Sequence, residues 1–250
     1  MDTALTYADS HADRFVSELE ELLRIPSVST DSAYDDEVER AAEWLADHFD
    51  GIGMEHTEII ETDGHPLVYA EHITAPDKPT VVVYGHYDVQ PPDPLEEWST
   101  DPFDPTRHDG ALYARGACDD KGQMFMHAKA AEAYLSAEGD LPVNLKYIIE
   151  GEEETGSMAI ETYVREQGER LDGDVVLVSD TAMFSPETPS ITYGLRGLAY
   201  VRSPWRARTR TFPPATTAAP WTNRPTPSVA SLPARPTTTP PTPSPRFSRT

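Results

Sequence analysis

Acidic residues and a histidine follow the ends of several apolar segments of this chain. His86 and Asp88 come directly after the run VVVYG, and Asp180 follows VVLVS. Asp119 and Asp120 stand together before another amphipathic segment. A neutral imidazole combined with carboxylates is a donor set that suits Zn²⁺, or Mn²⁺ where oxygen donors dominate. These residue types therefore predict a hydrolytic metal centre.

The stretch EGEEETGS, residues 150–157, crowds four carboxylates into five positions. No basic residue within it neutralises them, so a nearby cation would relieve their repulsion. Of the adjacent acids Glu153 and Glu154, one can bind an ion while the other moves a proton to and from water. We assign no function to Glu150 and expect Glu152 to be solvated.

The spacing of His86 and Asp88 predicts a further contact. Residues two apart on a strand point the same way, so Asp88 can accept the second ring N–H of His86 and orient the imidazole. One carboxylate that bridges two ions would hold them roughly 3.5–4 Å apart. The alternative interpretation is that these abundant acids form a solvated surface and that His86 is a hydrogen-bonded structural residue. We do not expect His108 or His127 to be ligands.

Apolar periodicity predicts the elements that must position these residues. We expect helices over 7–23, 35–49, 121–136 and 157–167, strands over 55–61, 67–73, 80–86, 143–151 and 174–180, a long loop over 89–110 and a hairpin over 190–201. The strands 80–86 and 174–180 are apolar throughout, which indicates burial on both faces. Strands that alternate with helices predict a layered α/β domain, in which ligands gather beyond the carboxyl ends of the strands.

The chain of 250 residues has a net charge of −23, and its charges are unevenly distributed. All 43 Asp and Glu lie in residues 1–201, whereas residues 202–250 hold eight Arg, no acidic residue and 12 of the 24 Pro. The acidic part would repel nucleic acids and anionic membranes, so we expect neither as a partner. A single cysteine, Cys118, and the lack of a signal-like or membrane-spanning segment predict a soluble cytoplasmic protein.

Five motifs occur along the chain in this order: VVVYGHYDVQP, WSTDPF, LYARGACDDKG, EGEEETGS and VSDTAMF. In their order and spacing they resemble the M20 family of metallopeptidases. They are most similar to the carnosinase-like and glutamate-carboxypeptidase-like dipeptidase branch, and the likeness covers residues from about 10 to 201. It implies the layered α/β/α fold of zinc-peptidase catalytic domains.

The resemblance also implies a dinuclear centre of Zn²⁺ or Mn²⁺. His86 and Asp180 would bind one ion, and Glu154 the other. Asp119 would bridge both ions, and its peptide bond to Asp120 is expected to be cis.

The same resemblance assigns the proton transfers. Glu153 would be the general base that deprotonates the attacking water and then the acid that protonates the leaving amine. Asp88 would be the partner of His86. The expected substrates are dipeptides or related small amides.

The likeness to the family stops after Val201. Family members continue into a lid domain, through which full-length relatives often form homodimers, and then return to the catalytic domain. That return supplies the last His ligand of the second metal, and this chain has no His after His127. Residues 1–201 are therefore expected to be the N-terminal part of the catalytic domain, without the lid and with an incomplete second metal site.

Two interpretations of residues 202–250 stay open. Synonymous codons can be chosen for Ala218 to Pro227 that, read one base earlier, encode Gly-Gly-Ala-Val-Asp-Lys-Pro-Ala-Asn-Ala, which resembles the lid segment of the family. A frameshift near residue 202 would then explain the segment. The alternative is a genuine disordered tail rich in Pro, Thr and Arg.

These observations predict metal-dependent hydrolysis of dipeptides by the family, with little or no turnover by the chain as written. Two other functions remain as alternatives. One is an amide hydrolase that acts on N-acyl amino acids, of the deacetylase or desuccinylase type. The other is a non-catalytic metal-binding protein whose Pro-rich tail binds a partner.

Overall fold

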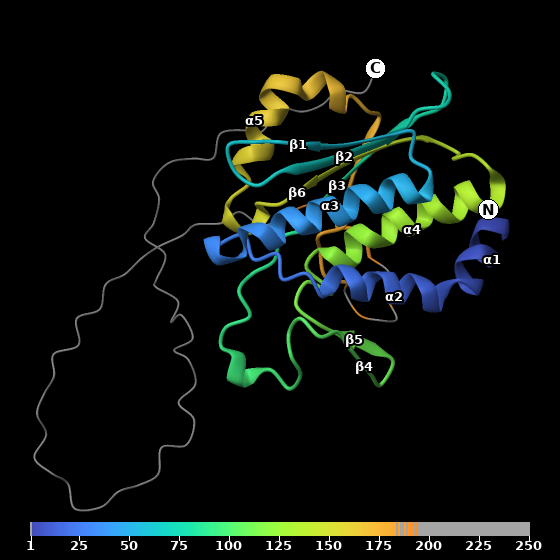
Figure 1. The fold of residues 1–250 in the computed structure, drawn as a ribbon. Coiled ribbons are helices and arrows are strands. Elements are labelled where there is room, and N and C mark those ends of the chain that lie inside the picture. Colours follow the sequence, from blue (N-terminus) through green and yellow to red (C-terminus); the bar gives the residue numbers. More distant parts are fainter. Residues whose placement is uncertain (1, 184, 186–187, 189, 193, 195–250) are drawn as a thin grey trace, which may run out of the picture. The chain divides into compact units, whose positions relative to one another are not determined.

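The structure is a computed structural model that describes residues 2–183, 185, 188, 190–192 and 194. Its helices are α1 (Asp2–Ser10), α2 (Ala12–Leu23), α3 (Asp35–Ile52), α4 (Lys121–Glu138) and α5 (Met158–Gln167), with single 3-10 turns η1 (Ser32–Tyr34), η2 (Leu95–Glu97), η3 (Glu153–Thr155) and η4 (Gly168–Leu171). Its strands are β1 (His56–Ile60), β2 (Leu67–His72), β3 (Thr80–His86), β4 (Thr106–His108), β5 (Ala111–Tyr113), β6 (Asn144–Glu150) and β7 (Val175–Val178) (Figure 1).

Five strands form a mixed sheet in the order β1-β2-β6-β3-β7. β1 pairs with β2 and β2 with β6 in antiparallel register, whereas β3 runs parallel to both β6 and β7. In the β3–β6 register, His86 stands opposite Glu150. The carboxyl ends of β3, β6 and β7 thus meet at one edge of the sheet, where ligands gather in such folds.

Helices cover both faces of this sheet, with α3 and α4 on one side and α5 on the other (Figure 1). Successive strand residues alternate between the two layers, as the pleat requires. Val83 and Tyr147 pack with the α3 and α4 residues, whereas Val82 and Ile148 pack against α5. The predicted layered α/β fold is confirmed.

Most of the predicted elements are present within two residues of their expected ends. The single helix predicted over 7–23 is wrong at its start, because a turn at His11 separates α1 from α2. Ala4 on α1 is buried. α1 packs against α4 more extensively than α2 does. Tertiary packing on α4 therefore overrides the continuous helical periodicity.

The prediction that 174–180 forms a buried strand is also wrong in part. β7 is a strand, but all four of its residues are exposed, with 65% of Val176 accessible. It lies at the edge of the sheet, and neither apolar layer includes a β7 residue among the described part of the chain. The hairpin predicted over 190–201 lies almost entirely outside the described residues.

The loop predicted over 89–110 contains more structure than expected. β4 and β5 form a hairpin whose turn is Asp109-Gly110, with φ of 50° and 78°. Asp-Gly is a favoured pair for turns that need two positive φ angles. The sequence therefore carried a hairpin signal that the loop prediction passed over.

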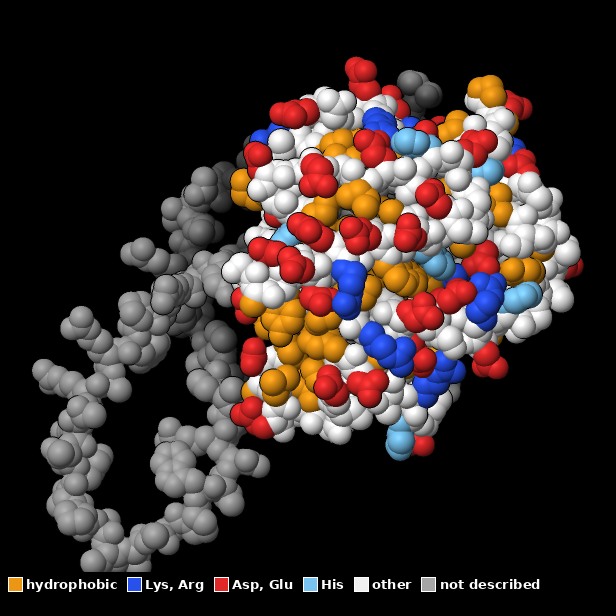
Figure 2. All heavy atoms as spheres, viewed as in Figure 1, with side chains coloured by type: hydrophobic (Ala, Val, Ile, Leu, Met, Phe, Trp, Pro, Cys, Tyr) orange, Lys and Arg blue, Asp and Glu red, His pale blue; other side chains and the backbone are white. Residues whose placement is uncertain are grey.

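Asp and Glu side chains are spread over the whole face seen in Figure 2. None of the described helices is long and apolar enough to cross a lipid bilayer.

Candidate metal centre

The end of β3 places His86 and Asp88 in the interior, and both are fully buried. Nδ1 of His86 lies 3.2 Å from Oδ1 of Asp88 and 3.0 Å from its backbone oxygen. Both neighbours are acceptors, so in the neutral ring Nδ1 carries the proton and Nε2 keeps its lone pair free. The expected contact between the two side chains is present.

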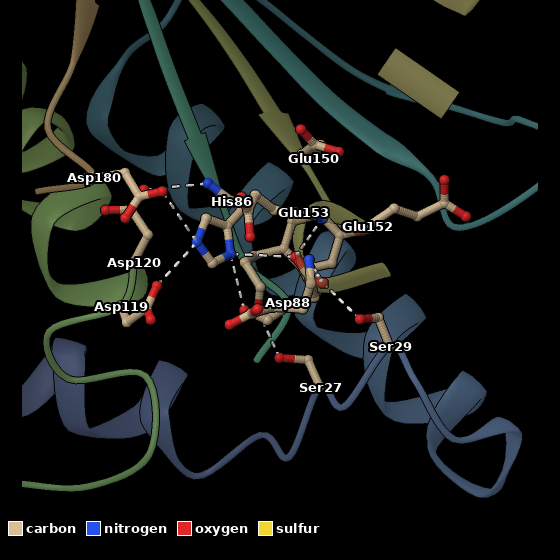
Figure 3. Close-up of polar contacts among 12 residues, drawn as sticks. Ser27, Ser29, His86, Asp88, Asp119, Asp120, Glu150, Glu152, Glu153 and Asp180 are labelled. Atoms are coloured by element: carbon tan, nitrogen blue, oxygen red, sulfur yellow. Dashed lines mark hydrogen bonds and ion pairs between the residues drawn. The ribbon is translucent and has the colours of Figure 1, made fainter. Parts of the chain in front are cut away.

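Nε2 of His86 faces two carboxylates from other elements (Figure 3). Oδ1 of Asp119, just before α4, is 3.3 Å away, and Oδ2 of Asp180, just after β7, is 3.8 Å away. The three donor atoms lie within 4.8 Å of one another. Nε2 is buried and makes no hydrogen bond to any described residue. An imidazole nitrogen without a partner beside two carboxylates fits a divalent cation.

Glu154 does not belong to this group of three donors. It lies in η3, and its carboxylate accepts a hydrogen bond from the side chain of Gln90. Burial and the nearby charges of Asp119 and Glu153 raise its pKa, against the lowering effect of Gln90. The charge of Asp119 thus acts on Glu154, while Oε2 of Glu154 accepts from Gln90.

Glu153 is partly buried next to Glu154 in η3. Burial is the largest cause that raises its pKa, and the carboxylates of Asp180 and Asp88 act in the same direction, whereas His86 lowers it. No Lys or Arg in the described part of the chain forms an ion pair with Glu153 or Glu154. For these two carboxylates, the nearby positive charge is that of His86, which lowers the pKa of both.

The carboxylates of this site also shift the pKa of His86. Burial lowers its pKa, but the hydrogen bond and charge of Asp88, with the charges of Asp120 and Asp180, raise it to about 10. Without a metal, the ring takes up a proton to balance the acids. A divalent ion would replace that proton, because a metal ligand must be deprotonated.

Asp88 contacts more than His86. Its Oδ1 accepts from the backbone N–H of Glu153 at 3.2 Å, and its Oδ2 accepts from that of Glu154 at 3.1 Å and from the hydroxyl of Ser29 at 2.6 Å. One carboxylate thus joins the end of β3, the loop after α2 and the start of η3. Ser29 was not predicted as a site residue, because its only signal in the sequence was its place in the polar segment that ends the first helical region.

The peptide bond between Asp119 and Asp120 is cis, as expected. Asp120 is buried, and its Oδ2 accepts from the backbone N–H of His86 at 3.2 Å. Burial raises its pKa to about 7, although His86 lowers it. A Cβ at Gly85 would lie 2.7 Å from Asp120 Oδ2 and 2.9 Å from Cβ of Met124, so this close approach requires glycine.

Lys121 follows the two aspartates and is fully buried. Its Nζ donates to the backbone oxygens of Leu22 at 3.1 Å and Ile25 at 2.7 Å, at the carboxyl end of α2. Burial lowers its pKa to about 7, against the raising charge of Asp88. This side chain ties the first turn of α4 to α2 and so fixes the segment that carries Asp119.

The two unassigned acids of EGEEETGS both have structural partners. Glu150 is fully buried and accepts from the hydroxyls of Tyr84 at 2.6 Å and Ser157 at 2.9 Å. The expectation that Glu152 is solvated is wrong. Its two oxygens accept from the backbone N–H groups of His65 at 3.0 Å and Ala159 at 3.1 Å, because the stretch folds back between a turn and the start of α5.

The two histidines not expected to be ligands lie away from the three donors. Nε2 of His127 is 2.7 Å from the hydroxyl of Ser179, next to Asp180 in sequence. His108 is exposed and faces Asp109. Neither is a member of the donor group around His86.

The chain matches known proteins along most of its length. It is 36% identical over 230 residues to Beta-Ala-His dipeptidase of Homo sapiens, covering 86% of this chain and 45% of the relative. It is 37% identical over 212 residues to Cys-Gly metallodipeptidase dug1 of Schizosaccharomyces pombe, covering 80% and 44%. The chain therefore spans about half the length of the curated relatives it matches.

Solved structures agree with these matches. The dipeptidase Dug1p of Saccharomyces cerevisiae superposes with a TM-score of 0.72 and 27% identity, over 77% of this chain and 43% of that one. Human carnosine dipeptidase 1 superposes with a TM-score of 0.70 and 37% identity, over 74% and 42%.

The match to a family description covers residues 82–245. The matched range extends past residue 201, so the family match gives no domain boundary at that residue. It includes the strand end with His86, both aspartates before α4, and EGEEETGS. The chain belongs to Peptidase family M20/M25/M40.

Proposed function

We propose that this protein is built for metal-dependent hydrolysis of dipeptides. The observation that carries the proposal is the buried Nε2 of His86, which faces Asp119 and Asp180 and has no hydrogen-bond partner among the described residues. The names of the relatives, a Beta-Ala-His dipeptidase and a Cys-Gly metallodipeptidase, support dipeptides as the substrate class.

His86, Asp119 and Asp180 would hold one ion, Zn²⁺ or Mn²⁺. Asp119 would be shared with a second ion, to which Glu154 would contribute after its side chain turns from Gln90. When bound, such ions lower the pKa of a water molecule and polarise the carbonyl of the scissile bond. Asp88 would hold the ring of His86 with Nε2 directed at the ion.

Glu153 is proposed to move the proton. The pKa of Glu153 is raised above that of an exposed Glu and so lies closer to neutral pH, which favours both the uptake and the return of a proton. It would accept a proton from the attacking water and deliver it to the leaving amine. Its backbone N–H is held by Asp88, so the base and the first ligand share one support.

For the second ion we propose only Asp119 and Glu154 as ligands, and the sequence has no His after His127. We therefore propose that the 250-residue chain binds one divalent ion and has little or no turnover. The out-of-frame origin of residues 202–250 also remains a proposal, and the nucleotide sequence around codon 202 tests it.

The test combines metal analysis with an activity assay. Equilibrium dialysis of the purified chain against Zn²⁺ or Mn²⁺ should give about one ion per chain, as expected for one complete ligand set. Hydrolysis of β-alanyl-histidine, cysteinyl-glycine and N-acetylated amino acids should then be measured with the loaded chain and with a frame-corrected version. Preference of the corrected enzyme for N-acetylated amino acids would contradict the dipeptide assignment. Binding of no ion would contradict the metal centre.

A further inference from the structure

The turn that carries Glu153 and Glu154 is held from both sides by side-chain carboxylates. On one side, Asp88 accepts from the backbone N–H groups of both residues. On the other side, the carboxylate of Glu152 accepts from the backbone N–H groups of His65 and Ala159. The orientation of the two acids thus depends on how firmly Asp88 itself is held (Figure 3).

Ser29 is the side-chain donor to Oδ2 of Asp88, whereas Oδ1 faces the imidazole of His86. Its hydroxyl lies 2.6 Å from Oδ2 of Asp88, and only 9% of its surface is accessible. Its backbone oxygen is 3.3 Å from Nε2 of His65, and the backbone N–H of His65 binds Glu152. These contacts close a ring of hydrogen bonds around the start of η3, and Ser29 contributes two of its links.

A second serine in the same loop allows a matched comparison. Ser27 is also buried, and its hydroxyl donates over the same 2.6 Å, but to the backbone oxygen of Tyr87. It touches no carboxylate of the site. Each hydroxyl thus donates one short hydrogen bond that holds the loop, but only the hydroxyl of Ser29 donates to Asp88.

We propose that Ser29 is a positioning residue of the candidate metal centre, which acts through Asp88 on His86, Glu153 and Glu154. The inference rests on the proposed function. Without the hydroxyl, Oδ2 of Asp88 keeps only the backbone N–H of Glu154 as a donor. Oδ1 still contacts the backbone N–H of Glu153 and Nδ1 of His86, so the carboxylate stays in place but is held less firmly, and the imidazole and the two acids are oriented less precisely.

The test uses the full chain and Co²⁺, whose visible absorption reports the geometry of its ligands and does not require turnover. Ser29→Ala should weaken Co²⁺ binding about tenfold, the lower end of the range for residues that support metal ligands, and should change the absorption spectrum. Ser27→Ala should leave both unchanged. Thermal unfolding of the metal-free chains should show a similar small loss for both variants, about 2–4 °C.

Equal Co²⁺ affinity and spectra for Ser29→Ala and the unsubstituted chain would overturn the positioning role and leave the proposed metal centre intact. Equal weakening by Ser27→Ala and Ser29→Ala would also overturn it, since the effect would then come from loop stability. An unsubstituted chain that binds no Co²⁺ would instead overturn the proposed function, and this inference with it.

Discussion

Within the described part of the chain, two clusters offer one histidine and two carboxylates close enough together to hold an ion, and they differ in what neutralises them. The first is His86 with Asp119 and Asp180, and the second is Glu18, His48 and Glu132, from α2, α3 and α4. In each cluster the three donor atoms lie within 4.8 Å of one another. Donor types and distances alone therefore do not distinguish them.

The second cluster contains its own cations. Nζ of Lys129 contacts both Glu18 and Glu132, and the guanidinium of Arg14 also contacts both. Lys129 in addition lies 4.7 Å from the ring centre of Phe125. The two acids are thus paired within the protein, although Nε2 of His48, like that of His86, is buried without a hydrogen-bond partner among the described residues.

Histidine behaves oppositely in the two clusters. Burial, helped by the charge of Lys129, lowers the pKa of His48 to about 4, so its ring is neutral and stacks on Trp44. The acids around His86 raise its pKa to about 10 against the effect of burial. The two clusters therefore differ in their counter-ions: Lys129 and Arg14 neutralise the acids around His48, whereas no Lys or Arg forms an ion pair with Asp119 or Asp180 among the described residues.

The largest expected effect is the loss of ion binding in His86→Ala. Residues that orient metal ligands contribute up to roughly 100-fold to metal affinity. His86→Ala removes a direct ligand, so binding of Zn²⁺ should weaken by more than that. Isothermal titration measures it. His48→Ala, which removes the histidine of the other cluster, is the control and should leave the affinity unchanged.

Lys129→Met should be the most destabilising change in the second cluster. Removing a buried cation leaves Glu132 and Glu18 with Arg14 alone, and should lower the free energy of unfolding by about 3 kcal/mol. Urea unfolding measures it. In a His86→Ala background, Zn²⁺ should then raise the unfolding temperature of the Lys129→Met chain. No rise would show that removing the internal cation does not make this cluster an ion site.

Acid should weaken the second cluster. Burial raises the pKa of Glu18 and Glu132, but contacts with Lys129 and Arg14 lower it below the model-peptide value of 4.5. Stability from such groups is complete above the unfolded pKa and is lost as pH falls through the lower folded pKa. The destabilisation by Glu132→Gln should therefore be large at pH 7 and shrink as the pH falls from about 4.5 towards the lowered pKa of Glu132.

Unfolding by urea across that pH range measures the difference between the two chains. Glu161→Gln provides the control, because Glu161 pairs with Arg165 on the exposed side of α5. Its effect should be small at every pH. A Glu132→Gln penalty that does not change with pH would mean that packing, and not charge, holds this cluster.

The smallest expected effect is that of Arg14→Lys. A lysine keeps the charge but cannot span both Glu18 and Glu132 as the guanidinium fork does. Because 39% of the Arg14 side chain is accessible, the loss should be only about 0.5–1 kcal/mol in urea unfolding. A loss as large as that of Lys129→Met would show that Arg14 is the main counter-ion.

The sequence predicted the strand ends of the site well, because parallel strands with polar residues after their carboxyl ends follow a general rule of layered α/β folds. That rule brought His86 and Asp180 to one edge, whereas Asp119 comes from the segment before α4. It could not supply the orientation of Glu154 or the burial of Lys121, since both depend on contacts with residues far away in the sequence. The sequence pattern also could not predict which cluster contains its own cations, because Lys129 contacts Glu18 across more than a hundred residues.

The errors have a common cause. β7 looks like a buried strand by composition, but its exposure depends on which elements lie beside it. Glu152 looks like a surface acid in an acidic chain, yet it binds two backbone groups of other segments. Apolar and charged patterns report the local preference of a segment, whereas burial is decided by its neighbours.

The strand order has a consequence for how the molecule is made. β2 and β3 are consecutive in the chain but do not touch, because β6 lies between them. A ribosome must therefore release residues 144–150 before the centre of the sheet can close. Until then the apolar β2 and β3 stay unpaired on their inner edges, where they can pair with other chains. During synthesis the nascent chain is therefore prone to aggregate until β6 has left the ribosome, and a chaperone bound during that time would prevent the wrong pairing.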